Sequence, residues 1–370
     1  MSCTINKKKS KFVFILGSVS QPRCIKRINS FIENNIDVDV FGFDRGKQSL
    51  NASVNGKEII VLSKQEAGKK YIRRLFEAQL AIRSVVSRYK NERVVYYSFG
   101  FLPTVLLFYT GVRSYIYEIS DILYGYRKFR FFRWGLKSID KLLIKRSILT
   151  VMTSKGFSNY FFKAHSPDNI IVQPNKLPYS FLEKIVKERP NSESLVFSFV
   201  GTFRSPETIF RFARIIGANY PEFEFYFYGD SQLTGEVIEL SDKYINIKYF
   251  GPFQNPEQLE EIYHKIDIVV ACYNNKELNE RILEPNKLYE ALFFKKPIIV
   301  SEGTYLAERI KYYGCGFDIN PMDDNSIISL LDSIDIETLE SIKDNIKNIP
   351  LEETIDDNSK KIISYLEENI

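Results

Sequence analysis

The sequence predicts an α/β protein made of two doubly wound domains in tandem. Short apolar, β-branched runs alternate with amphipathic stretches along nearly the whole chain. This alternation is typical of a parallel sheet whose two faces are covered by helices. The 370 residues exceed a single core of about 150 residues, so two domains are expected. A polar, charged stretch at residues 181–194 separates the two series of elements.

The first series predicts a domain over residues 1–185. Fully apolar or alternating runs predict seven strands, at residues 12–16, 38–43, 58–63, 94–99, 115–119, 149–153 and 170–172. Helical spacing of apolar residues predicts helices at residues 24–33, 71–90 and 138–146, and a short apolar helix precedes residue 115.

The second series predicts a domain over residues 190–345. Its strands are expected at residues 195–200, 223–228, 245–250, 266–272, 297–301 and 316–319. Helices are expected at residues 207–216, 257–264, 287–294 and 305–312, and from about residue 327 onwards. Ligands of such sheets bind beyond the carboxyl ends of the strands, so we expect two facing domains with a two-substrate cleft.

The composition excludes several classes of protein. The four cysteines form no CxxC pair and the two histidines stand far apart, which argues against disulfide scaffolds and zinc sites. No apolar run approaches the roughly 18–20 residues that span a bilayer. We therefore expect a cytoplasmic protein, either soluble or peripheral on the inner face of the cell membrane.

The charge is divided unevenly along the chain. Residues 1–180 hold 31 Lys/Arg and 12 Asp/Glu, a net +19, and residues 181–370 hold 20 and 34, a net −14, which together give the overall +5. A basic half joined to an acidic half indicates that the two halves have different partners.

Two turns are candidates for ligand binding. Residues 16–23, LGSVSQPR, place Gly17 between a strand and a helix, where free backbone N–H groups can face a ligand. The turn lacks the GxGxxG pattern of NAD sites, and a plain connecting turn remains the alternative. In residues 284–292, EPNKLYEAL, Lys287 and Glu290 share one helical face. They can meet a phosphate and a ribose, or simply form an ion pair with each other.

Residues 281–301 resemble the nucleotide-binding signature of the GT-B glycosyltransferases, in particular the retaining family 4. Further stretches resemble landmarks of that family in order and spacing: YEISD at 117–121, QPN at 173–175, VGTFR at 200–204, FYFYGD at 225–230, IKYFGP at 247–252 and DIVV at 267–270. The resemblance covers about residues 10 to 320. It implies two Rossmann-like domains facing across a cleft, and a C-terminal helix (346–370) that packs back on the first domain.

The resemblance also implies roles for single residues. Glu290 resembles the glutamate that holds the donor ribose, and Arg204 the basic residue that meets the donor diphosphate. Gly201 lies in the turn that opens the donor domain, and Gly17 resembles the loop that closes over the donor.

The chain departs from the family pattern at two places. Another glutamate is common eight positions before Glu290, where this chain has Ile282. Glu280 and Glu284 flank that position, and Glu284 is the donor-binding candidate. The usual lysine shortly after the arginine is absent, and Lys287 is expected to replace it, as in a subgroup with the pattern Pro-x-Lys-x-x-Glu.

Glycosyl transfer develops negative charge on a leaving diphosphate, so cations placed at that position stabilise the transition state. Arg204 and Lys287 are the catalytic candidates for this role. Asp121 is the candidate base of an inverting reaction, with a strand-end turn as the alternative. The paired aspartates at 37–39 and 323–324 occupy a strand and a helix cap, so a metal-independent reaction without a cofactor is expected.

A basic, aromatic stretch at residues 126–146 predicts a surface for a partner. It carries eight Lys/Arg and one Asp, with five aromatic residues at its start. This composition favours binding to an anionic membrane. A nucleic-acid surface and a plain solvated face are the alternatives, and of these we do not expect nucleic acid. The residues assigned to the membrane and acceptor surface are Arg127, Lys128, Arg130, Arg133, Trp134 and Lys137.

Together these features predict a retaining glycosyltransferase that moves a sugar from a UDP- or GDP-sugar. The expected acceptor is a saccharide or polyprenyl-diphosphate-linked glycan of surface polysaccharide synthesis. The alternatives are a sugar-nucleotide epimerase of the same fold and a non-catalytic scaffold that binds membrane or nucleic acid.

Overall fold

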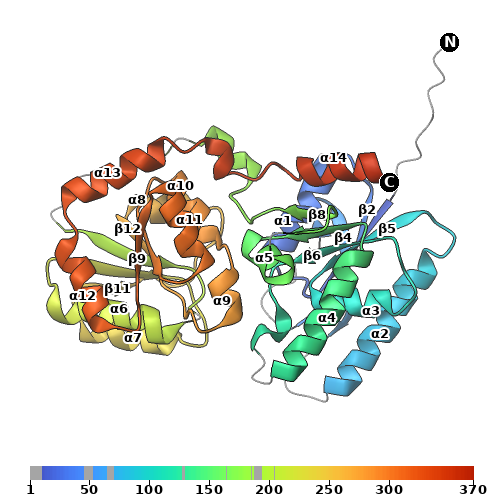
Figure 1. The fold of residues 1–370 in the computed structure, drawn as a ribbon, viewed down its shortest axis with the longest axis horizontal. Coiled ribbons are helices and arrows are strands. Elements are labelled where there is room, and N and C mark those ends of the chain that lie inside the picture. Colours follow the sequence, from blue (N-terminus) through green and yellow to red (C-terminus); the bar gives the residue numbers. More distant parts are fainter. Residues whose placement is uncertain are drawn as a thin grey trace, which may run out of the picture. The chain divides into compact units, whose positions relative to one another are not determined.

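The computed structural model describes residues 11–45, 53–64, 71–126, 130–163, 165–184, 186, 194–203 and 205–370 (Figure 1). The chain forms two units: Met1–Gln173 with Asp357–Ile370, and Pro174–Asp356. This division lies before the predicted boundary at residues 185–190, because Leu177 and Phe181 already insert into the second core. Phe181 packs edge-on against the rings of Phe293 and Phe294.

The first unit is built on an eight-stranded sheet in the order β3-β4-β2-β1-β5-β6-β7-β8. The strands are β1 Lys11–Leu16, β2 Val38–Asp44, β3 Ser53–Val54, β4 Lys57–Lys64, β5 Val94–Phe99, β6 Tyr115–Ile119, β7 Leu149–Met152 and β8 Ile170–Val172. All neighbours pair in parallel except β3 and β4, whose antiparallel hairpin turns at Asn55 and Gly56 with positive φ. An Asn-Gly turn is a strong hairpin signal, and β3 was absent from the prediction.

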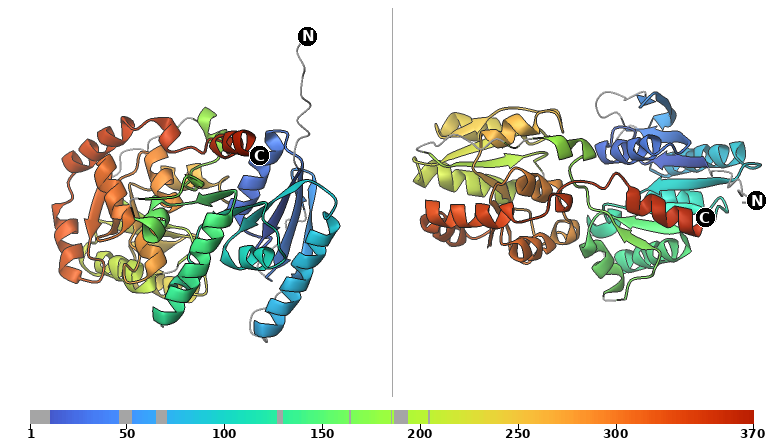
Figure 2. Two further views of the ribbon diagram at one scale, coloured as in Figure 1. Left: turned by 45° about the vertical axis from the view of Figure 1, so that its right-hand side comes forward. Right: turned by 90° about the horizontal axis from the view of Figure 1, so that it is seen from above.

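Helices cover both faces of this sheet (Figure 2). They are α1 Pro22–Glu33, α2 Tyr71–Arg88, α3 Phe101–Phe108, α4 Arg130–Arg146, α5 Lys155–Phe162 and α14 Lys360–Asn369, with a 3-10 turn at Leu123–Tyr126. Helices α1 and α14 share one core with β1, β2, β5 and β6, and Ile362 and Leu366 of α14 lie within it. Residues 357–370 therefore belong to the first unit, while residues 346–356 stay with the second.

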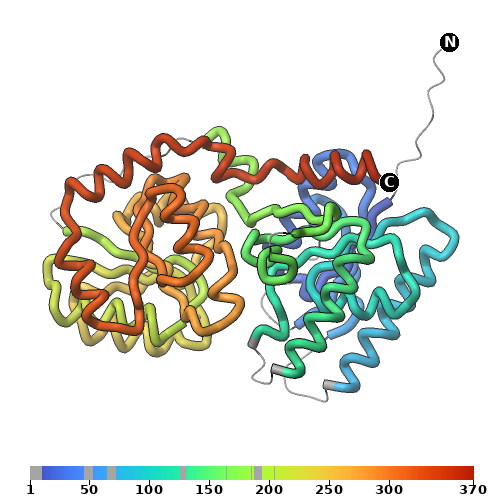
Figure 3. The backbone as a smooth tube through the Cα atoms, viewed as in Figure 1, coloured from blue at the N-terminus to red at the C-terminus, as the bar shows by residue number. Residues whose placement is uncertain are grey.

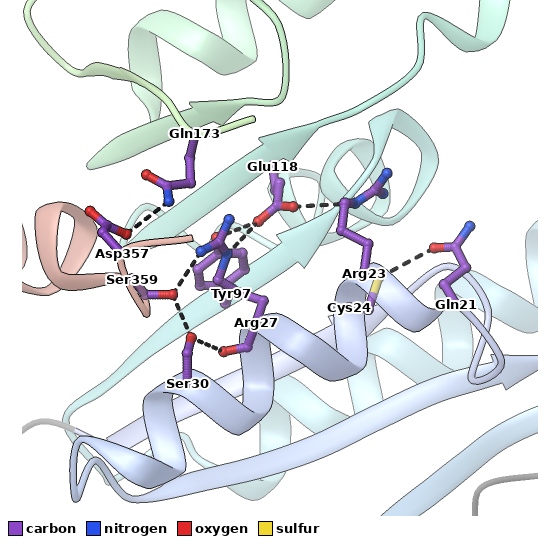
Figure 4. Close-up of polar contacts among 10 residues, drawn as sticks. All are labelled: Gln21, Arg23, Cys24, Arg27, Ser30, Tyr97, Glu118, Gln173, Asp357 and Ser359. Carbon is purple, nitrogen blue, oxygen red and sulfur yellow. Dashed lines mark hydrogen bonds and ion pairs between the residues drawn. The ribbon is translucent and has the colours of Figure 1, made fainter. Parts of the chain in front are cut away.

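The C-terminal segment ends in the first unit (Figure 3), which it joins through a buried polar cluster (Figure 4). Glu118, at the end of β6, pairs with Arg27 of α1 at 3.2 Å and with Arg23 at 3.3 Å, and it accepts a hydrogen bond from Tyr97. Arg27 also donates to the hydroxyl of Ser359 at 2.7 Å. The carboxylate and Arg27 are almost wholly buried, so each needs the other as a partner.

The second unit contains a parallel six-stranded sheet in the order β11-β10-β9-β12-β13-β14. The strands are β9 Val196–Val200, β10 Glu224–Tyr228, β11 Ile247–Tyr249, β12 Ile268–Ala271, β13 Ile298–Ser301 and β14 Gly316–Ile319. The helices are α6 Pro206–Asn219, α7 Thr234–Lys243, α8 Leu259–His264, α9 Leu278–Ile282, α10 Asn286–Phe293, α11 Tyr305–Tyr313, α12 Asp324–Ser333 and α13 Ile336–Lys347, with 3-10 turns at Tyr179–Glu183 and Leu351–Glu353. The two parallel sheets confirm the predicted α/β class.

The strand orders locate a switch point in each unit. In the first sheet the chain runs outward from β1 through β2 on one side and from β5 on the other. In the second sheet the switch point lies between β9 and β12, since the chain runs outward from β9 through β10 on one side and from β12 through β13 on the other. The loops beyond the carboxyl ends of such a strand pair diverge to opposite faces, which leaves room for a ligand between them.

Candidate functional site

Three glycines lie at the carboxyl ends of neighbouring strands beside the switch point of the second unit. Gly201, Gly229 and Gly251 follow β9, β10 and β11, and all have positive φ. A Cβ on Gly229 would lie 2.1 Å from the carbonyl oxygen of Gly201, closer than any side chain can approach. The backbones after β9 and β10 therefore pack too tightly for a side chain at Gly229.

Lys287, in the first turn of α10, lies at this switch point. Its ammonium group is 3.2 Å from the hydroxyl of Tyr273, which follows β12, and 4.5 Å from the ring centre of Phe199 in β9. It also lies beside Gly201, 2.9 Å from the position that a Cβ would take there. Within the described ranges no carboxylate comes within ion-pair distance of it. The charge is thus held between the ends of β9 and β12 by aromatic groups, without an acidic partner.

Glu290, one turn further along α10, is buried behind Lys287. Its carboxylate accepts a hydrogen bond from the hydroxyl of Tyr263 at 2.8 Å, and no ion pair links it to Lys287. Burial raises the pKa of Glu290, and the nearby charge of Lys287 and the hydrogen bonds from Tyr263 and Asn255 oppose that rise. The simple ion pair that the spacing allowed is therefore not what positions these two side chains.

Glu284 makes its contacts inside the unit. Its carboxylate pairs with Arg309 of α11 at 2.9 Å and accepts the hydroxyl hydrogen of Tyr289 at 2.6 Å. Burial raises the pKa of Glu284, while Tyr289 and Arg309 lower it. These contacts join the start of α10 to α11, and the donor-binding role of Glu284 stays a prediction.

Glu280, which is not among the predicted site residues, connects the two loops at the switch point. Its carboxylate accepts hydrogen bonds from the hydroxyl of Ser205, after β9, and from the backbone N–H of Asn274, after β12. Burial raises its pKa, which these two bonds oppose. The residue lies on α9, a helix of five residues, which is too short to show helical periodicity in the sequence.

The other predicted site residues lie in the first unit or outside the described residues. Gly17 lies at the switch point of the first sheet, where a Cβ would be 3.6 Å from the carbonyl oxygen of Phe99. Asp121 is exposed just beyond β6. Arg204, Arg127 and Lys128 fall outside the described residues, and for Arg130 only its place in α4 is described.

Helix α4 carries part of the predicted basic and aromatic stretch, and its aromatic side chains are exposed. Phe131 and Trp134 are 82% and 68% exposed, and Arg133 is partly exposed. Lys137 is directed inward instead: its ammonium donates to the carbonyl of Tyr160 at 2.7 Å and lies over that ring. Burial lowers the pKa of Lys137. Its contribution to a surface is therefore smaller than the sequence indicated.

The described ranges show neither a cluster of metal ligands nor a helix that could span a membrane. No three His, Cys, Asp or Glu side chains gather there as metal ligands would, and the metal-independent reaction stays a prediction. None of the helices described is long and apolar enough to cross a membrane.

Comparison with known proteins places the fold. No protein-family model and no curated protein sequence matches the chain. Among solved structures it is similar to Anabaena Alr3699/HepE in complex with UDP and glucose, with a TM-score of 0.72 and 13% identity over 97% of this chain and 100% of that one. It is also similar to WaaG, a glycosyltransferase involved in lipopolysaccharide biosynthesis, with a TM-score of 0.66 and 13% identity over 93% and 97%.

A UDP-N-acetylglucosamine 2-epimerase is similar as well, with a TM-score of 0.60 and 14% identity over 96% of this chain and 95% of that one. Glycosyltransferases and this epimerase thus share one chain fold at low sequence identity. From these likenesses and the two parallel sheets, the chain has the GT-B glycosyltransferase fold.

Proposed function

We propose that the protein is a glycosyltransferase that uses a nucleotide-sugar donor. The observation that carries this proposal is the position of Lys287 between the ends of β9 and β12, where its ammonium group donates to Tyr273 and has no carboxylate partner among the described residues. A cation at the switch point of a doubly wound sheet suits a diphosphate. The UDP complex of the structurally similar HepE supports a uridine nucleotide as the first donor to test.

Each group has a distinct task in this reaction. The ammonium of Lys287 offsets the negative charge that develops on the departing diphosphate, and Arg204 adds a second cation. The carboxylate of Glu290 accepts hydrogen bonds from the ribose hydroxyls. Glu280 holds the loops after β9 and β12 in one arrangement, so that the phosphate groups meet a preformed site. We infer a retaining reaction that needs neither a metal nor an enzymatic base.

The test is UDP binding by the Glu290→Gln variant, measured by calorimetry. Removing a charge-assisted hydrogen bond loses about 1.5–3 kcal/mol, so we expect roughly 10- to 150-fold weaker binding. The amide oxygen of the glutamine can still accept the hydrogen bond from Tyr263, so the melting temperature should be preserved. Glu340→Gln, on the exposed face of α13, is the matched control. Equal UDP affinity in Glu290→Gln and wild type would refute the ribose role, and no binding of UDP or GDP to wild type would refute the donor class.

The products separate transfer from the epimerase alternative. A transferase releases UDP from a UDP-sugar with an acceptor or water, whereas a 2-epimerase changes the configuration of the sugar. Release of UDP that depends on Lys287 supports transfer, and an epimerised sugar supports the alternative.

The acceptor side of the proposal rests on the first unit. Exposed aromatic rings next to basic groups on α4 suit an anionic membrane surface, where aromatic rings enter the interface and cations meet lipid headgroups. We therefore infer a peripheral enzyme on the inner face of the cell membrane that adds sugar to a lipid-linked glycan of surface polysaccharide synthesis.

A further inference from the structure

The second unit is joined to the first at both of its ends, and the two end segments, residues 174–178 and 351–356, pair with each other. The backbone N–H of Leu177 donates to the carbonyl of Thr354 at 3.0 Å, and that of Asp356 donates to the carbonyl of Leu177 at 2.8 Å. These segments are called the connecting pair below. Because backbone hydrogen bonds join them, a shift of one segment displaces the other.

Helix α10, which carries Lys287, begins in contact with the connecting pair. Asn286 is the first residue of the helix, and its side-chain oxygen accepts a hydrogen bond from the side-chain amide of Asn175 at 2.7 Å. The ammonium group of Lys176 lies 5.8 Å from the ring centre of Tyr289 in the same helix. Lys287 directly follows Asn286, so the contact with Asn175 holds the turn that carries the cation of the candidate site.

A second route of side chains leads from the start of α10 to the connecting pair. Glu284, just before the helix, pairs with Arg309 of α11. The guanidinium of Arg309 also donates to the hydroxyl of Tyr313 at 2.5 Å, and this hydroxyl donates to the carboxylate of Glu353 at 3.0 Å. Glu353 belongs to the connecting pair, and its carboxylate lies 3.9 Å from the ammonium group of Lys176. The start of α10 is thus joined to the connecting pair by two separate sets of contacts.

These contacts matter because the first turn of α10 has no capping side chain. A capping side chain normally fixes the first turn of a helix. Here the position of that turn depends instead on the contacts of Glu284 and Asn286. Lys287 lies in the same turn, and its ammonium group reaches the gap between the ends of β9 and β12. A small shift of the turn therefore moves the cation away from a bound phosphate.

We propose that Asn175 and Tyr313 are positioning residues of the donor site, which couple nucleotide binding at Lys287 to the pairing of the connecting segments. A bound phosphate fixes the first turn of α10, and the two sets of contacts then stabilise the connecting pair. This inference rests on the proposed function for the identity of the ligand. It adds that the two ends of the second unit respond when the donor site is occupied.

The experiment measures hydrogen exchange of residues 174–178 and 351–356 in the full chain, with and without saturating UDP. In wild type, UDP should slow exchange of these amides at least about fivefold, the lower end of coupling between two sites in a protein. In the double variant Asn175→Ala/Tyr313→Phe, with UDP again raised to saturation, the change should fall below about twofold. Tyr313→Phe removes only the hydroxyl, so Arg309 and Glu284 keep their ion pair. The melting temperature of the variant establishes that it is folded.

The matched control is the double variant Asn325→Ala/Tyr312→Phe. Both side chains are exposed, in α12 and α11, and neither takes part in the two sets of contacts. This control should keep the wild-type response to UDP. A merely structural role of Asn175 and Tyr313 would speed exchange equally with and without UDP, and that result would overturn the proposal.

Calorimetry with UDP separates this inference from the proposed function. If wild type binds UDP and the connecting pair does not respond, the coupling is wrong and the donor proposal stands. An equal response in wild type and in Asn175→Ala/Tyr313→Phe also refutes the coupling. If wild type binds neither UDP nor GDP, the donor proposal and the coupling fail together. A response that is lost only in Asn175→Ala/Tyr313→Phe supports both.

Discussion

Asp140 provides a pH-dependent test of how α4 is attached to the first unit. The carboxyl group is almost wholly buried and accepts hydrogen bonds from Tyr117 of β6 at 2.8 Å and Tyr124 at 2.9 Å. Burial raises its pKa from 3.8 to about 7, and the two tyrosine hydrogen bonds oppose the rise. The exposed aromatic face of α4 thus depends on a buried acid that ionises near neutral pH.

The size and sign of the effect follow from proton linkage. Because the folded pKa is higher than the unfolded one, the folded state binds more protons between pH 4 and pH 7, and stability falls as the pH rises through this range. A shift of about 3 units corresponds to about 4 kcal/mol, of which about 2.5 kcal/mol falls between pH 5 and pH 8. This is roughly a 60-fold change in the local opening constant.

Hydrogen exchange of the α4 amides measures this opening directly. The Asp140→Asn side chain has the same shape but cannot ionise. In this variant the protection factors of the α4 amides, which are corrected for intrinsic exchange, should therefore stay constant between pH 5 and pH 8. Wild type should lose roughly 60-fold over the same range. Asp168→Asn, an exposed change in the same unit, should follow wild type. If wild type and Asp140→Asn respond equally to pH, the ionisation of Asp140 does not control the docking of α4.

Two further predictions concern the glycine edge and the membrane surface. In Gly229→Ala the new Cβ would lie 2.1 Å from the carbonyl oxygen of Gly201. This overlap should lower the free energy of unfolding of the second unit by several kcal/mol, on the order of the cost of strained or overpacked core sites, and abolish UDP binding. The control is Gly235→Ala in α7, where a Cβ meets open space and the melting temperature should be raised or preserved. If Gly229→Ala folds and binds UDP, the packing argument is wrong. Changing Phe131 and Trp134 to Ser should weaken binding to anionic vesicles about tenfold or more in sedimentation assays, and unchanged binding at low salt would exclude α4 as the contact.

Much of the fold could be predicted because buried positions produce a regular pattern of apolar residues in the sequence. Strands such as β1 and β5 are buried on both faces and appear as continuous apolar runs. Helices α5 and α7 were missed, since the former is only eight residues long and the latter is largely polar. The hairpin of β3 had a readable Asn-Gly turn, but its two-residue strand carries no periodicity.

The candidate site was only partly predictable. The spacing of Lys287 and Glu290 indicated one helical face, but an ion pair between them fitted the sequence equally well. The structure gives them different partners, Tyr273 from the loop after β12 and Tyr263 from helix α8. Glu280 gave no signal, because its importance depends on loops that are distant along the chain.

The sequence by itself determined the α/β class, the two series of elements and the residues of α10. These depend on local periodicity and on turns within a few residues. Only the tertiary structure decided that Lys287 lies between β9 and β12, that Glu284 is engaged by Arg309, and where residues 174–184 and 357–370 pack. Such contacts join residues that are remote in sequence, and they are fixed by strand order and by which apolar side chains complete each core.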